Sequence, residues 1–216
     1  MNEMILKTLE DQLYDKDALL LKYSIQYPEI VASSFYGKKA FNDYNLQKAL
    51  SLKKYAEETL FKQAKEDYDY ATSHSYPFFP YEIIATPTIT YNNDSTISLY
   101  IDQYTYTGGA NGSTYRQSQN WDMIIGCDIP LFSFFPHKPY FLLPILLEIN
   151  HQIEEQSQYY FDNYCTLVLQ TFSPLHYYLE NQSIVIFFEQ YDIAPHSTGI
   201  PTFSIQSDIF KGIATF

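Results

Sequence analysis

Residues 41–71 carry apolar side chains at the spacing of an α-helix, in the run FNDYNLQKALSLKKYAEETLFKQAKEDYDYA. Charged residues occupy the outer positions, and the side chains that fall on one face are those of Leu46, Ala49, Ala56, Leu60 and Ala64. Asn42 or Asn45 can cap the start of this helix, because a short polar side chain there accepts hydrogen bonds from free backbone N–H groups. A helix with one apolar face has to bury it against another element, so we expect this long amphipathic helix to pack on a sheet.

The segments before and after the helix alternate apolar and polar residues, as half-buried strands do. Residues 19–31 predict a strand that ends near Pro28. Residues 81–106 predict a β-hairpin whose turn lies at 92–94. Pro87 has no N–H to donate to a neighbouring strand, so we expect the first strand of the hairpin to lie at an edge or at a bulge.

The rest of the chain adds strands and one more helix. A third antiparallel strand follows the hairpin and ends in a turn at 126–130. Residues 144–156 predict a second helix, whose apolar face is made by Ile145, Leu146, Ile149 and Ile153. The apolar run 184–188 is typical of a buried central strand, and a loop at 192–201 leads to a last short strand. This order predicts an α+β fold: antiparallel sheets with one long N-terminal helix and a second helix packed on them.

Composition narrows the class of protein and of partner. With 46% hydrophobic and 18% charged residues, the 216-residue chain falls among globular proteins of one or two domains. A formal charge of −12 argues against a nucleic-acid backbone as partner, since phosphate binding needs clustered Lys and Arg. The charge either attracts a basic partner or only keeps the protein soluble. The 22 Tyr and 16 Phe are either strand formers or part of a recognition surface.

Neither an export signal nor a membrane span is visible in the sequence as given. No apolar run reaches the length of a membrane helix, and the start, MNEMILKTLEDQLYDKD, lacks the basic-then-apolar order of a signal peptide. We therefore expect a soluble chain, although one trimmed of an anchor would look the same. Cys127 and Cys165 form either one disulfide or two thiols.

The glycine-rich stretch at 104–118, YTYTGGANGSTYRQS, does not match a phosphate-binding loop. It has neither the GxxxxGK of a Walker loop nor a GxGxxG that opens a helix, and it leads into a strand. We therefore expect its glycines to have a backbone role: they allow positive φ or the close approach of another group. We interpret the stretch as a shaped surface turn.

A search for catalytic and metal-binding patterns finds none that is complete. Glu148 and His151 form one ExxH with Glu154 one turn on, whereas a di-iron centre needs two such motifs. No serine lies in GxSxG, and neither cysteine has the local pattern of a Cys–His enzyme. Isolated carboxylates that can in principle pair for acid–base work are Asp122, Asp128, Asp192 and Asp208. We expect no catalytic residue, no metal and no cofactor.

Several stretches together resemble a known family. YTYTGGANG is similar to the Tyr-Thr-Gly-Gly-Ala-His-Gly signature of the DUF3298 family, which usually follows a DUF4163 or PdaC-type region. Further matching stretches are YSIQYPEI, NNDSTISLYIDQYTYTGG, IPLFSFF and FEQYDIAPHSTGIPTFSI. The family includes the extracytoplasmic, lysozyme-sensing part of RsiV anti-sigma factors and the N-terminal part of some peptidoglycan deacetylases. The resemblance implies a PdaC-like subdomain at 1–112 and a DUF3298 subdomain at 113–216, forming one integrated unit.

The resemblance also implies a function and a site. It predicts a non-catalytic, extracytoplasmic sensor module that binds a cell-wall-related ligand, either a glycan or a basic protein such as a C-type lysozyme. The residues expected to bind lie in two loops: Thr107, Gly108, Gly109, Asn111, Tyr191, Pro195 and His196. Turn formation alone is the alternative role of the glycines and of Pro195.

This chain departs from the family at two points, and other functions stay open. Asn111 stands where the family commonly has His, and we expect neither an N-terminal sigma-binding segment with a membrane span nor a C-terminal deacetylase domain. One alternative is an enzyme that modifies peptidoglycan, or its accessory domain. The other is an intracellular, cytoplasmic scaffold for protein interactions.

Overall fold

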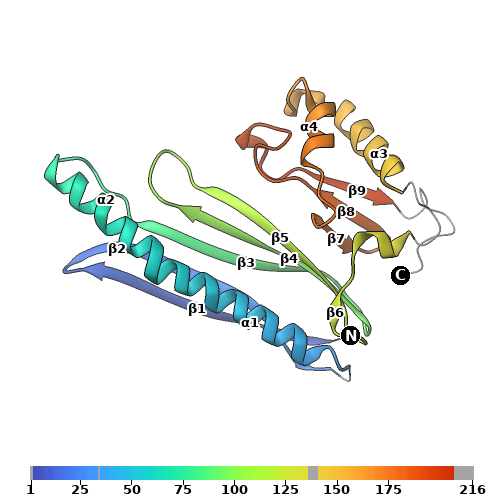
Figure 1. Cartoon of the computed structure of the whole chain (residues 1–216), viewed down its shortest axis with the longest axis horizontal. Coiled ribbons are helices and arrows are strands. Elements are labelled where there is room, and N and C mark those ends of the chain that lie inside the picture. The colour runs from blue at the N-terminus through green and yellow to red at the C-terminus, as the bar shows by residue number, and fades with distance from the viewer. Residues whose placement is uncertain (1, 34, 136–140, 207–216) are drawn as a thin grey trace.

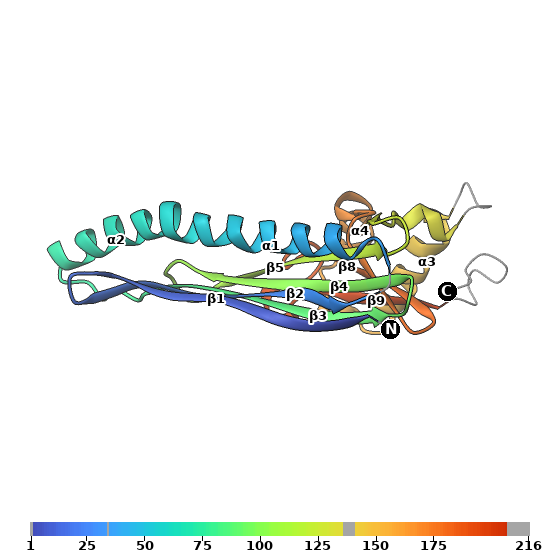
Figure 2. The ribbon, with the colours of Figure 1, turned by 90° about the horizontal axis from the view of Figure 1, so that it is seen from below.

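The computed structural model describes residues 2–33, 35–135 and 141–206. It is an elongated molecule in which a helical rod runs along one face of a long sheet, and a smaller unit of sheet and helices sits at one end (Figures 1 and 2). The expected α+β fold with antiparallel sheets is confirmed. None of the helices in these residue ranges is long and apolar enough to span a membrane.

The first sheet contains six strands in chain order, and only β2 and β3 are parallel. The helical rod connects these two strands, as a crossover between parallel neighbours requires. The strands are β1 (Glu3–Asp15), β2 (Ala18–Ala32), β3 (Tyr81–Asn92), β4 (Thr96–Tyr106), β5 (Ser113–Asp122) and β6 (Cys127–Asp128). The predicted hairpin and third antiparallel strand are confirmed as β3, β4 and β5.

The predicted long helix is confirmed as a rod made of α1 (Lys38–Tyr55), a π-helical turn (Ala56–Leu60) and α2 (Phe61–Ser73). Four of its five expected apolar positions are buried, and Leu46 is 39% exposed. The buried side of the rod packs on β2 and β3, in a cluster that includes Tyr23, Ile25 and Ile83. Three alanines on this side let the rod approach the sheet closely.

The expected asparagine cap is wrong. The helix starts after Gly37, which makes no side-chain cap, and Asn42 and Asn45 lie inside the first turns. Asn42 instead accepts a hydrogen bond from the Ile30 N–H at 2.8 Å and donates to the Ile30 carbonyl at 3.0 Å. Asn45 is buried and accepts from Gln119 Nε2 at 3.0 Å. Both amides therefore fasten the rod to the sheet.

Three strand predictions also need correction. β1 was not predicted, because charged residues interrupt its apolar pattern and leave most of it exposed. β2 runs through Pro28 to Ala32, since β3 pairs with β2 only as far as Ile25. β3 is an inner strand, and its bulge lies at 89–91 and not at Pro87. Pro87 lies beyond the part of β3 that pairs with β2, so its missing N–H removes no hydrogen bond between these two strands.

The second sheet packs with two helices around a separate core. Its strands are β7 (Tyr177–Glu180), β8 (Ser183–Phe187) and β9 (Thr202–Gln206), and its helices are α3 (Leu142–Glu154) and α4 (Tyr164–Thr171). The predicted second helix and buried central strand are confirmed as α3 and β8, whereas α4 was not predicted. Ile145, Ile149 and Ile153 on α3 pack in one cluster with Ile184 and Ile186 on β8.

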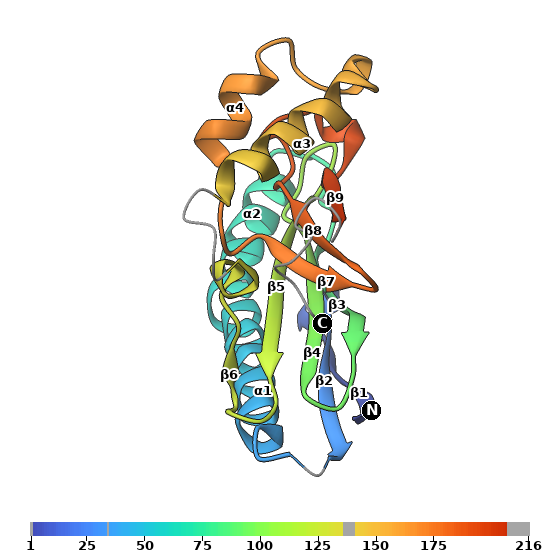
Figure 3. The same cartoon turned by 90° about the vertical axis from the view of Figure 1, so that its right-hand side faces the viewer.

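The second sheet lies across β3–β5 (Figure 3) and is held there by polar contacts. Leu179 N–H donates to Ser98 Oγ at 2.8 Å, and Asn120 Nδ2 donates to the Tyr177 carbonyl at 2.9 Å. Alternate side chains of β5 therefore contact the rod and the second sheet, since neighbouring residues of a strand point to opposite faces. The six-stranded sheet includes strands from both sides of the expected boundary between residues 112 and 113, since β5 begins at Ser113 and pairs with β4. The division of the chain at that point stays a prediction.

Candidate ligand-binding site

The two loops predicted from the resemblance lie side by side in the structure. The turn between β4 and β5 (the first loop, 107–112) and the loop between β8 and β9 (the late loop, 188–201) enclose a surface hollow of about 560 Å³. Its lining is formed by Thr105, Thr107, Asn111, Gly112, Ser113, Thr114, Tyr115, Glu189, Gln190, Tyr191 and His196. We call this hollow the loop site.

Three hydrogen bonds hold the late loop in place, one to the first loop and two to β5. His196 Nε2 lies 3.1 Å from the Gly112 carbonyl oxygen, across 84 residues of sequence. Gln190 Oε1 accepts from the Thr114 N–H at 2.7 Å, and Glu189 Oε2 accepts from the Arg116 N–H at 3.2 Å. Side-chain oxygens of the late loop thus accept from the backbone N–H groups of β5, as the carbonyl oxygens of a neighbouring strand would. These bonds attach the wall of the loop site to β5.

The glycines of the first loop have two separate backbone roles. Gly108 and Gly109 adopt φ of +97° and +88°, with open space where a side chain would begin. At Gly112 a Cβ atom would meet the Tyr104 ring at 2.5 Å. The predicted reasons for glycine, positive φ and close approach, therefore apply at different positions.

Tyr191 and His196 present aromatic rings at the loop site. Tyr191 is 64% exposed and has a φ of +71°, a conformation that costs a residue with a side chain about 1 kcal/mol or more. Its ring centroid lies 5.6 Å from that of His196. An exposed ring held in a strained backbone conformation is a feature found at binding sites.

The carboxyl group in the lining of the loop site, that of Glu189, has a shifted pKa. Burial raises the pKa of Glu189 to about 7, against the lowering effect of the Arg116 N–H that it accepts. Its second oxygen, Oε1, is buried without a hydrogen-bond partner among the residues that the structure describes. The negative charges of Asp192 and Asp102 act in the same direction as burial. Glu189 therefore changes its charge near neutral pH.

Of the seven residues expected to bind, four line the loop site and three do not. Thr107, Asn111, Tyr191 and His196 belong to its wall. Gly108, Gly109 and Pro195 are exposed beside it, and Pro195 precedes a short 3₁₀ turn (His196–Thr198). The lining residues missed by sequence reasoning are Thr105, Gly112, Ser113, Thr114, Tyr115, Glu189 and Gln190. Proximity to the two loop motifs was the signal that could have found them.

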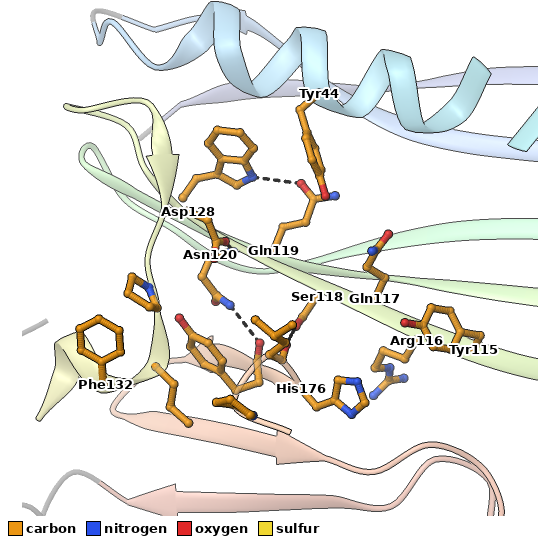
Figure 4. Close-up of a pocket in the computed structure, with 16 residues that line it drawn as sticks. Tyr44, Tyr115, Arg116, Gln117, Ser118, Gln119, Asn120, Asp128, Phe132 and His176 are labelled. Atoms are coloured by element: carbon orange, nitrogen blue, oxygen red, sulfur yellow. Dashed lines mark hydrogen bonds between the residues drawn. The ribbon is translucent and has the colours of Figure 1, made fainter. Parts of the chain in front are cut away.

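A second hollow, of about 530 Å³, lies along β5 between α1 and the segment before β7 (Figure 4). On the α1 side, Gln119 Oε1 accepts from Trp121 Nε1 at 3.0 Å. On the other side, Ser118 and Asn120 point toward the second sheet, where Ser118 Oγ donates to the Leu175 carbonyl at 2.9 Å. Its remaining walls come from the segment that follows β6.

The carboxylates and the ExxH motif have structural neighbours. Asp122 accepts from two backbone N–H groups in the turn after β5, Asp128 accepts from the Asn120 N–H, and Asp192 accepts from the Glu189 N–H. Asp208 lies outside the described residues. His151 is 3.8 Å from Glu155 on the exposed side of α3. Within 2–33, 35–135 and 141–206, no three His, Cys, Asp or Glu side chains are grouped as a metal site would need.

Cys127 and Cys165 are exposed and free. Of the two alternatives from the sequence, one disulfide or two thiols, the structure has two thiols.

Two family models and two solved structures are similar to this chain. A family model described as deacetylase PdaC matches residues 14–114, and a model described as a protein of unknown function, DUF3298, matches residues 140–208. No curated protein matches the chain. A DUF3298 family structure from Bacteroides fragilis is similar with a TM-score of 0.73 and 15% identity, covering 100% of this chain and 94% of that one. A second, from Pseudomonas aeruginosa, has a TM-score of 0.66 and 15% identity, covering 99% of this chain and 95% of that one. The chain therefore carries a PdaC-type region in its first half and a DUF3298 region in its second half.

Proposed function

We propose that the chain is a non-catalytic binding module for a cell-wall-related ligand, and that its concrete partner is a basic protein of the C-type lysozyme kind. The observation that carries this proposal is the meeting of the two loops. Thr107 and Asn111 from one loop, and Tyr191 and His196 from the other, line one hollow although the loops are far apart in sequence. Binding residues commonly lie on loops that a rigid sheet positions, and β5 fills that role here.

Charge supports a basic partner. The chain has a formal charge of −12, and the loop site holds Glu189 with no Lys in its lining. C-type lysozymes are strongly basic, so long-range attraction would raise the association rate and would weaken with salt. Shape and polar contacts at the loop site would then have to supply the binding that survives at physiological salt.

The proposal also includes the location and arrangement of the module. The resemblance to the lysozyme-sensing part of RsiV anti-sigma factors favours an extracytoplasmic position, where such a ligand is met. In this view the PdaC-like subdomain at 1–112 supplies the first loop and the DUF3298 subdomain at 113–216 supplies the second. Gly108, Gly109 and Pro195 shape the loops, and the ligand contacts come from the four side chains that line the hollow.

Substitution of Asn111 tests the proposal, because its side chain is exposed and its loss should not affect folding. We expect Asn111→Ala to weaken lysozyme binding by about tenfold in calorimetric titration, the cost of roughly one lost polar contact. The matched control is Asn181→Ala, another exposed loop asparagine, which does not line the loop site. Equal affinities of both variants and of the natural chain would refute the loop site.

A second candidate, a peptidoglycan deacetylase or its accessory domain, is favoured by the description of the PdaC family model. The test is the release of acetate from N-acetylated peptidoglycan fragments, measured with and without added zinc. A non-catalytic module releases no more than the blank in either condition. Turnover that rises with protein concentration would replace the binding proposal by an enzymatic one.

A further inference from the structure

The outer edge of β5 is only partly covered by the chain itself. β6 pairs with Trp121 and Asp122, and the Ile129 N–H donates to the Asn120 carbonyl at 2.6 Å. After Ile129 the chain turns away at Pro130. At the other end of the strand, the side chains of the late loop accept from the Thr114 and Arg116 N–H groups, as described above.

These contacts show which backbone groups point to the open edge. The N–H groups of 114, 116 and 120 all donate away from β4, so even-numbered residues of β5 face outward. By the same alternation, the N–H and C=O of Ser118 lie on this edge. Ser118 is thus the centre of a gap between the end of β6 and the side chains of Glu189 and Gln190.

The second hollow surrounds this gap. Tyr44 forms one wall and the segment 174–177 forms the other, while Phe132 closes the end near β6 (Figure 4). Phe132 is 62% exposed and Leu175 is 72% exposed, so the end of the groove and the wall at 174–177 each offer an apolar surface. A volume of about 530 Å³ lies within the range of ligand-binding pockets.

The charges at this groove favour one kind of ligand. Asp128 lines the β6 end, and Glu189 lies next to the opposite end. The one cationic side chain in the lining, Arg116, is held by two hydrogen bonds of 2.7 Å to Asp102. Its guanidinium also stacks 3.7 Å from the Tyr100 ring centre, so it is not offered to an anion.

We propose that this groove binds an extended peptide segment of another protein, which adds to β5 as a short strand at Ser118 and carries Lys or Arg beside alternating apolar residues. Strand addition is a common mode of peptide recognition, in which backbone bonds give affinity and pockets for alternate side chains give specificity. β6 already uses the same edge in the same way. The inference is independent of the loop site, which has its own lining residues apart from Tyr115.

The test is a selection of random eight-residue peptides displayed on phage against the full chain. We expect enriched peptides in which apolar residues alternate with Lys or Arg. Leu175→Glu and Phe132→Glu should each reduce their affinity at least tenfold, because a carboxylate replaces an apolar wall. The matched control is Leu169→Glu on α4, which is 66% exposed and does not line the groove. Lysozyme titration of the same variants should be unchanged, which separates this inference from the loop site.

Backbone pairing is tested with the peptides themselves. An enriched peptide with alternate backbone nitrogens methylated on its pairing edge should lose binding, and the unmodified peptide should slow amide exchange at Ser118. Three results would overturn the inference: no enrichment above an empty support, equal affinity of the methylated peptide, or unchanged binding to Leu175→Glu and Phe132→Glu. Peptidoglycan fragments that bind this groove while peptides do not would also overturn it.

Discussion

At the scale of single residues, the loop site combines a carboxyl group that titrates near neutral pH with an aromatic ring on strained backbone. Glu189 is half-buried and accepts the Arg116 N–H, and Tyr191 follows two residues later with positive φ. Both features reduce stability, and both are kept next to the candidate binding surface. This is typical of functional sites, where local strain and shifted pKa values gather.

The raised pKa of Glu189 makes stability depend on pH in a definite direction. Between pH 4.5 and about 7, the folded chain keeps a proton that the unfolded chain has lost, so the free energy of unfolding falls as pH rises through this window. Glu189→Gln removes this penalty and can still accept from Arg116. We expect the variant to exceed the natural chain by roughly 1 kcal/mol at pH 8, reduced by partial solvent screening, and to match it at pH 4.

Urea unfolding at both pH values measures this difference. Glu180→Gln serves as the control, because Glu180 is exposed. A Glu189→Gln effect of the same size at pH 4 and pH 8 would contradict the assignment.

Because the backbone of Tyr191 is strained, we expect its replacement by glycine to affect stability and binding differently. Tyr191→Gly should leave Tm unchanged or raise it, since glycine adopts positive φ freely and the exposed ring contributes little packing. The same change should weaken lysozyme binding by removing a ring from the wall of the loop site. Lys16→Gly is the matched control, because Lys16 is also exposed with positive φ (54°) and should gain stability without any effect on binding. A large loss of Tm in Tyr191→Gly would show that the ring is structural.

At the scale of elements, the start of the helical rod is set by contact with the turn after β5. Gly37 N–H donates to the Met123 carbonyl at 2.8 Å, and an added Cβ atom at Gly37 would lie 2.7 Å from that oxygen. The φ of Gly37 is −65°, so its backbone conformation suits any residue. Glycine is needed at this position for space alone.

Gly37→Ala should therefore destabilise the chain by about 1–3 kcal/mol, as overpacking of a close contact does. Gly37 is the N-cap of the helix, where Gly is preferred over Ala, so this smaller effect acts in the same direction. Thermal unfolding followed by circular dichroism measures the change. Lys39→Ala, at an exposed neighbouring position with only a surface ion pair, should change stability by less than about 1 kcal/mol. A stabilising Gly37→Ala would contradict the contact.

The elements with a clear period were predictable from the sequence, and those fixed by tertiary contact were not. The rod, the β3–β4 hairpin and α3 have strong apolar patterns that survive in the structure. β1 and α4 have weak patterns and are held in place by their neighbours. Pro28 and Pro87 suggested a strand end and an edge strand, but proline prevents pairing on only one side of a strand. Both prolines lie beyond the paired part of β2 and β3, and the length of that pairing cannot be read from the sequence.

Prediction of the loop site had the same limit. The resemblance pointed to both loops, and the structure brings four of their residues to one hollow. Glu189 and Gln190 were not predicted, since their importance comes from reaching the edge of β5 more than 70 residues away. Sequence spacing carries no information on such a contact.

At the scale of the whole molecule, β5 connects every part. One face of this strand meets the rod through Gln119, the other meets the second sheet through Asn120, and its edge holds the late loop. Both hollows lie along it. The −12 charge spreads over this frame and would attract a basic partner from a distance, while the loop site would decide whether it stays bound.

The most direct measurement is calorimetric titration of the full chain with a C-type lysozyme at low and at physiological salt. The binding proposal predicts saturable one-site binding that weakens with salt but persists at physiological ionic strength, and that Asn111→Ala and Tyr191→Gly reduce. Binding at low salt alone would be charge attraction between an acidic and a basic protein. That result, or a flat trace at both salt concentrations, would contradict the lysozyme-binding function.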